Sequence, residues 1–195
     1  MSGADAAGSE LAAADGAAVG RLMVTYHDEE WGVPISDDRE LFERLALESF
    51  QAGLAWVTIL RKREAFRRAF DGFDPALVAR YGDADRDRLL ADATIVRNRA
   101  KIDATIGNAA AFLAVVASHG SFAAYLAGQL PRPAPTLTAI EASRGIPSTT
   151  PESDALSADL KTRGFRFVGS TIVYAFMQSV GLVDDHLPGC FRYRS

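Results

Sequence analysis

Apolar residues recur at helical spacing along most of this chain, and no segment alternates apolar and polar residues as a half-buried strand does. Asp37, followed three residues later by Glu40, has the form of a helix N-cap. The helix that follows carries one stripe of four residues at intervals of four, three and four: Leu41, Leu45, Glu48 and Ala52. The same periodicity predicts further helices over residues 54–69, 75–81, 83–92 and 98–118.

The C-terminal part of the chain has the pattern of two helices joined by a short turn. Prolines recur between residues 130 and 151, which predicts a loop or linker there. Residues 152–163 then have a helical pattern, residues 164–169 (GFRFVG) form a tight turn, and residues 170–180 continue as a second helix. The pattern therefore predicts an all-α protein with a helix-hairpin-helix unit at about residues 152–180.

Composition divides the chain into a tail and one domain. Residues 1–20 are mainly Ala, Gly and acidic residues, a composition that buries little surface, and we expect a disordered tail there. Residues 21–195 contain no internal repeat and are enough for one compact domain, or for a main body with a small attached subdomain.

Charge and cysteine content narrow the classes of function. The net charge is -4, but the basic residues are clustered near residues 61–68, 97–101 and 161–166, where they form either a local cationic face for DNA or ordinary solvated helix faces. The single cysteine excludes an internal disulfide. The first residues lack the features of a signal peptide, and no apolar run of membrane-spanning length stands out, so we expect a cytoplasmic protein.

Glu48 is the candidate functional residue that the pattern singles out. It lies on an otherwise apolar stripe, and a buried carboxylate must be paired, protonated or used in chemistry. Tyr26, Trp31 and Trp56 lie near it in the sequence. An acid among aromatic rings suits a pocket for a flat cationic ligand, although a core ion pair for Glu48 and plain core packing for the rings explain the same pattern.

Two further groups of residues are candidates for binding. At the hairpin, Gly164 and Gly169 allow the backbone to approach a phosphate, and the next helix directs its N-terminus, at Ser170 and Thr171, to the same anion. An ordinary turn between two helices has the same pattern.

The second group is His27, His186 and Cys190, which have the chemistry of three zinc ligands. For His27 alone, a hydrogen bond in the core is the alternative.

Several long segments in order resemble the bacterial 3-methyladenine DNA glycosylase I family, within the helix-hairpin-helix glycosylase superfamily. They include YHDEEWGVP, LESFQAGLAWVTILRKREAFRRAF, RNRAKIDATIGNA and SDALSADLKTRGFRFVGSTIVYAFMQSVGLVDDH, and together they extend over about residues 22–190. The resemblance implies the helical fold of that superfamily, with a body and a smaller subdomain that joins the chain ends.

The resemblance also implies roles for individual residues. Glu48 matches the acid that contacts the base, and Tyr26, Trp31 and Trp56 match aromatic residues of the base pocket. The loop that fills the gap left by the flipped nucleotide matches Gly53 and Leu54. Three of the four zinc ligands of the family match His27, His186 and Cys190.

The sequence departs from the family at three places. The fourth zinc ligand, a cysteine before His27, is absent, so either water or a nearby Asp completes a weaker structural site or the chain ends are held by packing alone. Met23 stands where a pocket tyrosine is common. Asp184 lies close to the place of the catalytic Asp of the wider superfamily, which leaves two carboxylates, Glu48 and Asp184, as candidates to steady the sugar cation.

The function implied is base-excision repair, in which 3-methyladenine is flipped out of alkylated DNA and removed by hydrolysis. No cofactor is expected for catalysis, and the absence of a lysine near Asp184 predicts a monofunctional hydrolase without strand cleavage. The expected partner is double-stranded DNA that contains alkylated adenine, bound by a monomer without any membrane. The alternative is a non-catalytic binder of alkylated or distorted DNA.

Overall fold

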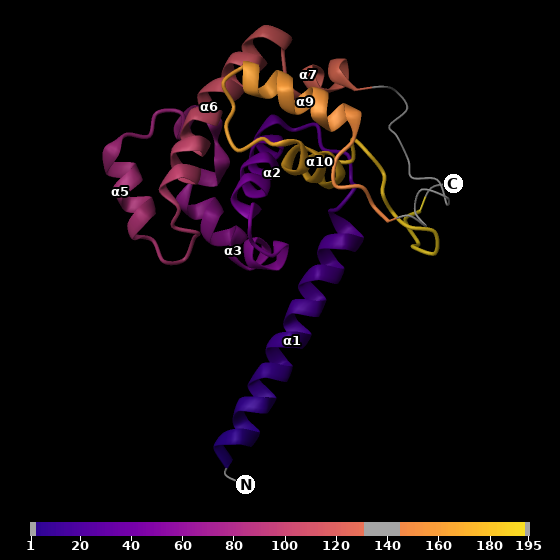
Figure 1. Cartoon of the computed structure of the whole chain (residues 1–195). Helices are drawn as coiled ribbons and strands as arrows, with labels where there is room; N and C mark the ends of the chain where they lie inside the picture. The colour runs from indigo at the N-terminus through magenta and orange to yellow at the C-terminus, as the bar shows by residue number, and fades with distance from the viewer. Residues whose placement is uncertain (1–2, 131–144, 194–195) are drawn as a thin grey trace.

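The computed structural model describes residues 3–130 and 145–193, with side chains from residue 16 onward, and within these ranges the protein is helical without strands (Figure 1). The helices of the first half are α1 (Gly3–Glu29), α2 (Asp38–Gln51), α3 (Trp56–Ala69), the short 3-10 helix η1 (Asp71–Phe73), α4 (Pro75–Val78) and α5 (Asp83–Ala91). Those of the second half are α6 (Arg99–His119), α7 (Phe122–Gln129), α9 (Pro151–Thr162) and α10 (Ser170–Ser179).

The predicted helices therefore lie where the periodicity places them, and the all-α class is confirmed. The helix predicted over residues 54–69 begins at Trp56, and the one predicted over residues 75–81 is a single turn, α4. Helix α7 is not predicted, because its eight residues are apolar enough to show no polar face. Most of the proline-rich stretch, residues 131–144, lies outside the described residues.

The structure of the N-terminal segment differs from the prediction. A disordered tail is predicted over residues 1–20, whereas the structure places Gly3–Glu29 in one helix that extends away from the body (Figure 1). Alanine has the highest helix propensity of all residues, so an alanine-rich segment can be helical without a buried face. Composition predicts poorly whether this segment is helical, because it indicates that few residues can be buried but not which backbone conformation they prefer.

Helix α2 is the centre of the body. It contacts α3, α6, α7 and α10, and all ten residues from Leu41 to Phe50 are buried. The sequence predicts one apolar stripe on this helix, but packing on every side also buries Glu43 and Arg44. A helix in such a position holds its side chains in fixed directions, because neighbours fill the space around them.

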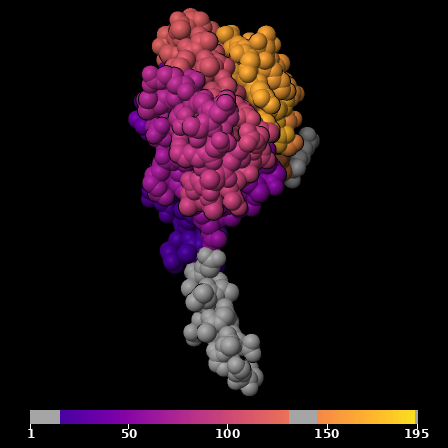
Figure 2. Space-filling model, turned by 90° about the vertical axis from the view of Figure 1, so that its left-hand side faces the viewer, coloured from indigo at the N-terminus to yellow at the C-terminus, as the bar shows by residue number. Residues whose placement is uncertain are grey.

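Phenylalanines supply much of the core around α2. Phe42 contacts Phe112 edge-to-face, with 5.3 Å between ring centroids, and Phe50 contacts Phe66 at 4.6 Å. Both pairs lie at the centroid separations that favour aromatic contacts. Viewed from the side of α5, the surface of the body is closed over this core (Figure 2).

Helix α6 runs through the body and is long and apolar enough, by length and composition only, to pass as a membrane span. Half of its most apolar window is buried inside the protein, as in the core helix of a globular domain. Its buried residues include Ile102, Ile106 and Phe112, which belong to the same core as α2.

The C-terminal part of the chain meets the last turn of α1 and the loop that follows it. Arg192 donates from its Nη1 atom to the carbonyl of Asp28 over 2.7 Å, and the amide of Ile35 donates to the carbonyl of Val180 over 3.3 Å. Gly32 has a φ of 75°, and a Cβ atom there would lie 2.7 Å from the His186 ring, so this close approach requires glycine. The C-terminal segment and the end of α1 therefore lie together, where the resemblance implies a subdomain.

Candidate functional site

Glu48 lies in a pocket between α2, α3, α10 and the end of α1. The pocket has a volume of about 170 Å³ and is lined by Tyr26, Trp31, Glu48, Gln51, Trp56, Ala175 and Gln178. The carboxylate and all three aromatic residues that the sequence places in a base pocket are thus brought together. A second cavity of about 270 Å³ adjoins the same rings and is lined by Met23, Tyr26, His27, Trp31 and Trp56.

Three lining residues were missed by the sequence analysis. Gln51 follows Glu48 by one helical turn, and this spacing could have identified it. Ala175 and Gln178 come from α10, more than 120 residues away along the chain, and no local pattern connects them to Glu48. Gln178 donates to Asp185 over 2.6 Å, which fixes the direction of its side chain.

The Glu48 side chain is 4% exposed, and its carboxylate has no ion-pair or hydrogen-bond partner among the described residues. Burial raises its pKa to about 8, and the positive charge of Arg44, one turn earlier on α2, opposes that rise. A core ion pair was the structural alternative for this acid. The structure contradicts that alternative, because the partner of Arg44 is Glu30, at 2.6 Å.

Glu30 pairs with two arginines next to the pocket. Its carboxylate accepts from Arg44 and from both terminal nitrogens of Arg63, and these contacts lower the pKa of Glu30 despite its partial burial. The Arg44 guanidinium also lies over the Tyr26 ring, with 5.6 Å from Cζ to the centroid. Arg44 thus supplies a fixed positive charge beside Glu48 without neutralising it through direct contact.

The aromatic walls have hydrogen-bond donors as well as ring faces. The Tyr26 and Trp56 rings are tilted by 51°, with 5.4 Å between their centroids. The indole nitrogen of Trp56 is buried and has no partner within the described part of the chain, so it is free to donate to a ligand. Burial, followed by the negative charge of Glu48, raises the pKa of Tyr26, so its hydroxyl stays protonated and is a donor too.

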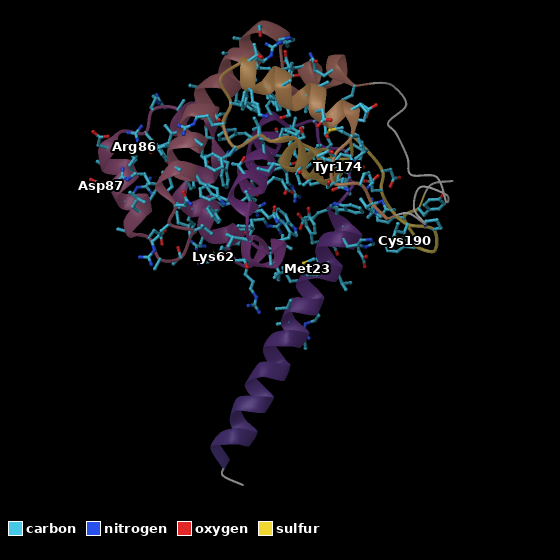
Figure 3. All side chains as sticks on the ribbon, in the orientation of Figure 1. Met23, Lys62, Arg86, Asp87, Tyr174 and Cys190 are labelled. Atoms are coloured by element: carbon cyan, nitrogen blue, oxygen red, sulfur yellow. The ribbon has the colours of Figure 1, made fainter. Side chains whose placement is uncertain are left out.

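His27, His186 and Cys190 meet beside the pocket, with their ligand atoms all within 4.8 Å of one another. Figure 3 shows Cys190 on the C-terminal segment at the edge of the body. The Cys190 sulfur lies 3.6 Å from His27 Nε2, close to the separation of about 3.6 Å that tetrahedral zinc imposes on one sulfur and one nitrogen ligand.

The other ring nitrogens support the same interpretation. His27 Nδ1 donates to Asp28 over 2.7 Å and His186 Nδ1 to Asp184 over 2.6 Å, so in each ring Nε2 carries the free lone pair. His186 Nε2 is buried without a partner among the described residues. The donor set therefore fits zinc, and Asp184 is occupied in orienting His186.

The loop between α2 and α3 carries Gly53 and Leu54 on the surface. Gly53 has a φ of 80°, which suits glycine, and the Leu54 side chain is 37% exposed. The loop is fixed from below by Lys101, whose amine donates to the carbonyls of Phe50 and Ala52 over 2.8 and 2.6 Å. The sequence places Lys101 in a cationic surface cluster, whereas it is 7% exposed and holds this loop.

The hairpin residues lie between α9 and α10 as predicted. Gly164 follows the C-cap of α9 and has a φ of 93°, Gly169 directly precedes α10, and Ser170 and Thr171 belong to the first turn of α10. Leu54 and the hairpin are separated by more than 100 residues, and both adjoin helices that line the pocket.

Comparisons with known proteins agree with this geometry. A model described as methyladenine glycosylase matches residues 17–193. DNA-3-methyladenine glycosylase 1 of Escherichia coli (strain K12) is 48% identical over 172 residues, which cover 88% of this chain and 91% of that protein. A crystal structure of 3-methyladenine DNA glycosylase I has a TM-score of 0.84 and 47% identity, covering 89% of this chain and 94% of the other. A structure of 3-methyladenine recognition by the Staphylococcus aureus enzyme has a TM-score of 0.83 and 38% identity, with 89% and 92% covered.

Proposed function

The chain belongs to the methyladenine glycosylase family, and on that premise we propose that it is a base-excision repair enzyme that removes 3-methyladenine from alkylated DNA. The observation that carries the proposal is the unpaired, buried carboxylate of Glu48 in an aromatic pocket. Such a group suits a cationic base, because adenine methylated at N3 carries a positive charge that favours the ionised form of Glu48 when the base enters the pocket. The S. aureus relative recognises the same base.

Recognition combines charge, ring faces and hydrogen bonds. Tyr26 and Trp56 present ring faces that attract a cationic base. Glu48 accepts hydrogen bonds from the base, while the free indole N–H of Trp56 can donate to a ring nitrogen. Neutral adenine gains less from the carboxylate, so the pocket selects the alkylated base.

The reaction needs little catalytic assistance, because the positive charge of the methylated base already weakens the bond between the base and C1′. When that bond breaks, its electron pair neutralises the base, and positive charge develops on the sugar. Water then adds to C1′ and loses a proton. Glu48 is the carboxylate in the pocket that can steady this cation, whereas Asp184 is held by His186.

DNA must be bent open before the base can reach Glu48. The exposed Leu54 wedges into the gap left by the flipped nucleotide, and the Lys101 amine keeps its loop in place. The hairpin binds a phosphate of the strand that carries the flipped nucleotide through its backbone amides. The substrate is double-stranded DNA, and the protein acts as a soluble monomer.

We also propose that the enzyme is monofunctional. Strand cleavage by a glycosylase requires an amine that attacks C1′, and the three lysines of the chain are Lys62, Lys101 and Lys161. None lines the pocket, and Lys62 and Lys101 are occupied by backbone carbonyls. Incubation with methylated DNA is expected to leave intact strands with abasic sites, and strand breaks formed without added alkali would refute this.

A structural zinc ion held by His27, His186 and Cys190 is proposed beside the catalytic pocket. It would tie α1 to the C-terminal segment and supply no catalytic step. We expect up to one zinc per chain by elemental analysis, with weaker retention than a four-ligand site because the chain has no second cysteine. Cys190→Ser should lose the metal, and a wild-type protein that never binds zinc would remove this part of the proposal.

The test of the main proposal is release of free base from methylated DNA. Wild type should release 3-methyladenine, and comparison with 3-methylguanine and 7-methylguanine measures its selectivity. Glu48→Gln should be nearly inactive. The matched control is Glu43→Gln, which changes another buried carboxylate of α2 that is bonded to Arg67 outside the pocket. Binding without release by wild type would instead identify a non-catalytic binder.

A further inference from the structure

Three consecutive backbone units of the hairpin, residues 166–168, are each held by a buried side chain from a different helix. Asn108 of α6 accepts from the amide of Arg166 over 2.8 Å and donates to the carbonyl of the same residue over 2.9 Å. One side chain thus satisfies both polar groups of one peptide position, although the two residues are 58 apart in sequence.

Two serine hydroxyls complete the set. Ser49 of α2 lies 3.0 Å from the carbonyl of Phe167 and shares its proton with the carbonyl of Leu45 at 2.9 Å. Ser157 of α9 donates to the carbonyl of Val168 over 2.7 Å. Ser49, Asn108 and Ser157, called the hairpin clamp below, are 3% exposed or less, so each is a polar group placed in the core where leucine or alanine would be the ordinary choice.

The backbone that the clamp holds is strained. Phe167 has a φ of 54°, in the left-handed region that a residue with a Cβ rarely adopts and that costs about 1–2 kcal/mol. Local sequence does not favour this conformation, so contacts from elsewhere must maintain it. The hydrogen bonds of Asn108 to Arg166 and of Ser49 to Phe167 lie on the strained residue and on the one before it.

The strain has a consequence for the amides that follow. Among the described residues, no acceptor is found for the backbone amides of residues 167–172, which belong to the hairpin and to the first turn of α10. Their direction is set by the backbone at residues 166–168. Free amides of consecutive residues can bind one phosphate oxygen, and a change of one backbone dihedral angle would alter their directions.

We propose that Ser49, Asn108 and Ser157 are positioning residues that hold the hairpin backbone in its strained form, so that its free amides are preorganised for a DNA phosphate. The proposal rests on the proposed function, since it assumes that the hairpin meets DNA. It also joins the two halves of the site, because Ser49 directly follows Glu48 on α2.

The test separates DNA binding from base binding in the purified full-length chain. The variants are Asn108→Leu, Ser157→Ala and Ser49→Ala. For each, we would measure the dissociation constant for an undamaged duplex at several salt concentrations, the affinity for free 3-methyladenine, and the midpoint of thermal unfolding. Free base occupies only the pocket, so its affinity reports whether the pocket is intact.

Asn108→Leu should weaken duplex binding by about tenfold or more and reduce the slope of log K against log salt by about one, as expected for the loss of one phosphate contact. Each serine variant should weaken duplex binding by about threefold, in keeping with the loss of one hydrogen bond of several. Affinity for free 3-methyladenine should stay within about twofold of wild type in all three.

Matched controls remove buried hydrogen bonds that do not touch the hairpin. Thr105→Val acts one turn before Asn108 on α6, where the hydroxyl donates to the carbonyl of Lys101. Ser179→Ala acts on α10, where the hydroxyl donates to the carbonyl of Phe176. Both controls should lower the unfolding temperature as the clamp variants do and leave duplex affinity unchanged.

Folded clamp variants that bind the duplex as wild type does would overturn the proposal, and so would controls that weaken binding equally. If Asn108→Leu does not fold, the two serine variants decide the question by the same criteria. Duplex affinity is measured on undamaged DNA without any base release. A result that contradicts the proposed role of the clamp is therefore distinguishable from one that contradicts the glycosylase function. In the second case, wild type would release no base from methylated DNA.

Discussion

Replacing Glu48 by glutamine should stabilise the protein at neutral and alkaline pH while it removes the activity. The carboxylate is almost fully buried, and its pKa is raised to about 8. A folded-state pKa above the unfolded value of 4.5 means that the folded protein binds a proton more tightly. The stability linked to this proton is fully present below pH 4.5 and is lost as the pH rises through about 8.

The magnitude follows from the two pKa values. At 1.36 kcal/mol for each pH unit, the raised pKa of Glu48 lowers the free energy of unfolding, relative to its value at acid pH, by about 1 kcal/mol at pH 5 and about 4 kcal/mol at pH 7.5. Glutamine has nearly the same shape and never ionises, so it avoids this cost at every pH. The variant should therefore exceed wild type in the free energy of unfolding by an amount that grows by about 4 kcal/mol between pH 5 and pH 8.5.

Urea unfolding of both proteins at pH 5, 6, 7 and 8.5 measures this difference, and the contributions of all other titrating groups cancel because the two chains share them. Glu40→Gln, an exposed change on the same helix, controls for the loss of one negative charge and should differ from wild type by the same small amount throughout. Base release by Glu48→Gln should be lost over the whole range.

A stability difference that does not change with pH would refute the reasoning. It would mean that Glu48 ionises in the folded protein as it does in the unfolded chain, and the desolvated carboxylate on which the proposed recognition depends would not exist. A variant less stable than wild type at pH 8.5 would lead to the same conclusion.

Three further changes test other parts of the site. Arg44→Met removes the positive charge that opposes the raised pKa of Glu48, so the pH at which kcat/KM for base release reaches half its maximum should move upward, whereas an unchanged pH profile would contradict this role. Lys101→Met leaves the carbonyls of Phe50 and Ala52 without their donor and should lower the free energy of unfolding by about 1–3 kcal/mol in urea titrations, and a neutral effect would show that water replaces the amine. Leu54→Ala should reduce base release from duplex DNA by about tenfold or more, as expected if the side chain contributes about 1.4 kcal/mol or more to base flipping. The affinity for free 3-methyladenine should not change. An equal loss in both assays would show that the substitution damages the pocket instead.

Local pattern determines the helices of this protein but not how they are packed. Caps and periodicity place α2, α3, α5 and α6 to within about two residues, because these signals depend on neighbours within one or two turns. The same signals suggest only one apolar face on α2, and it is the packing of four helices around it that buries Arg44 as well as Glu48. Burial on all sides is a property of the assembled body.

The candidate site divides in the same way. The sequence by itself identified Glu48, the aromatic residues and the three potential zinc ligands, because acids on apolar stripes and metal-binding side chains are unusual wherever they occur, and the family resemblance gave them roles. Only the tertiary structure decided that Glu30 takes the ion pairs of Arg44 and leaves Glu48 unpaired. It alone brought Gln178 into the pocket and Asn108 to the hairpin. These contacts join residues far apart in the chain, and their energies depend on distance in space, which periodicity along the sequence does not record.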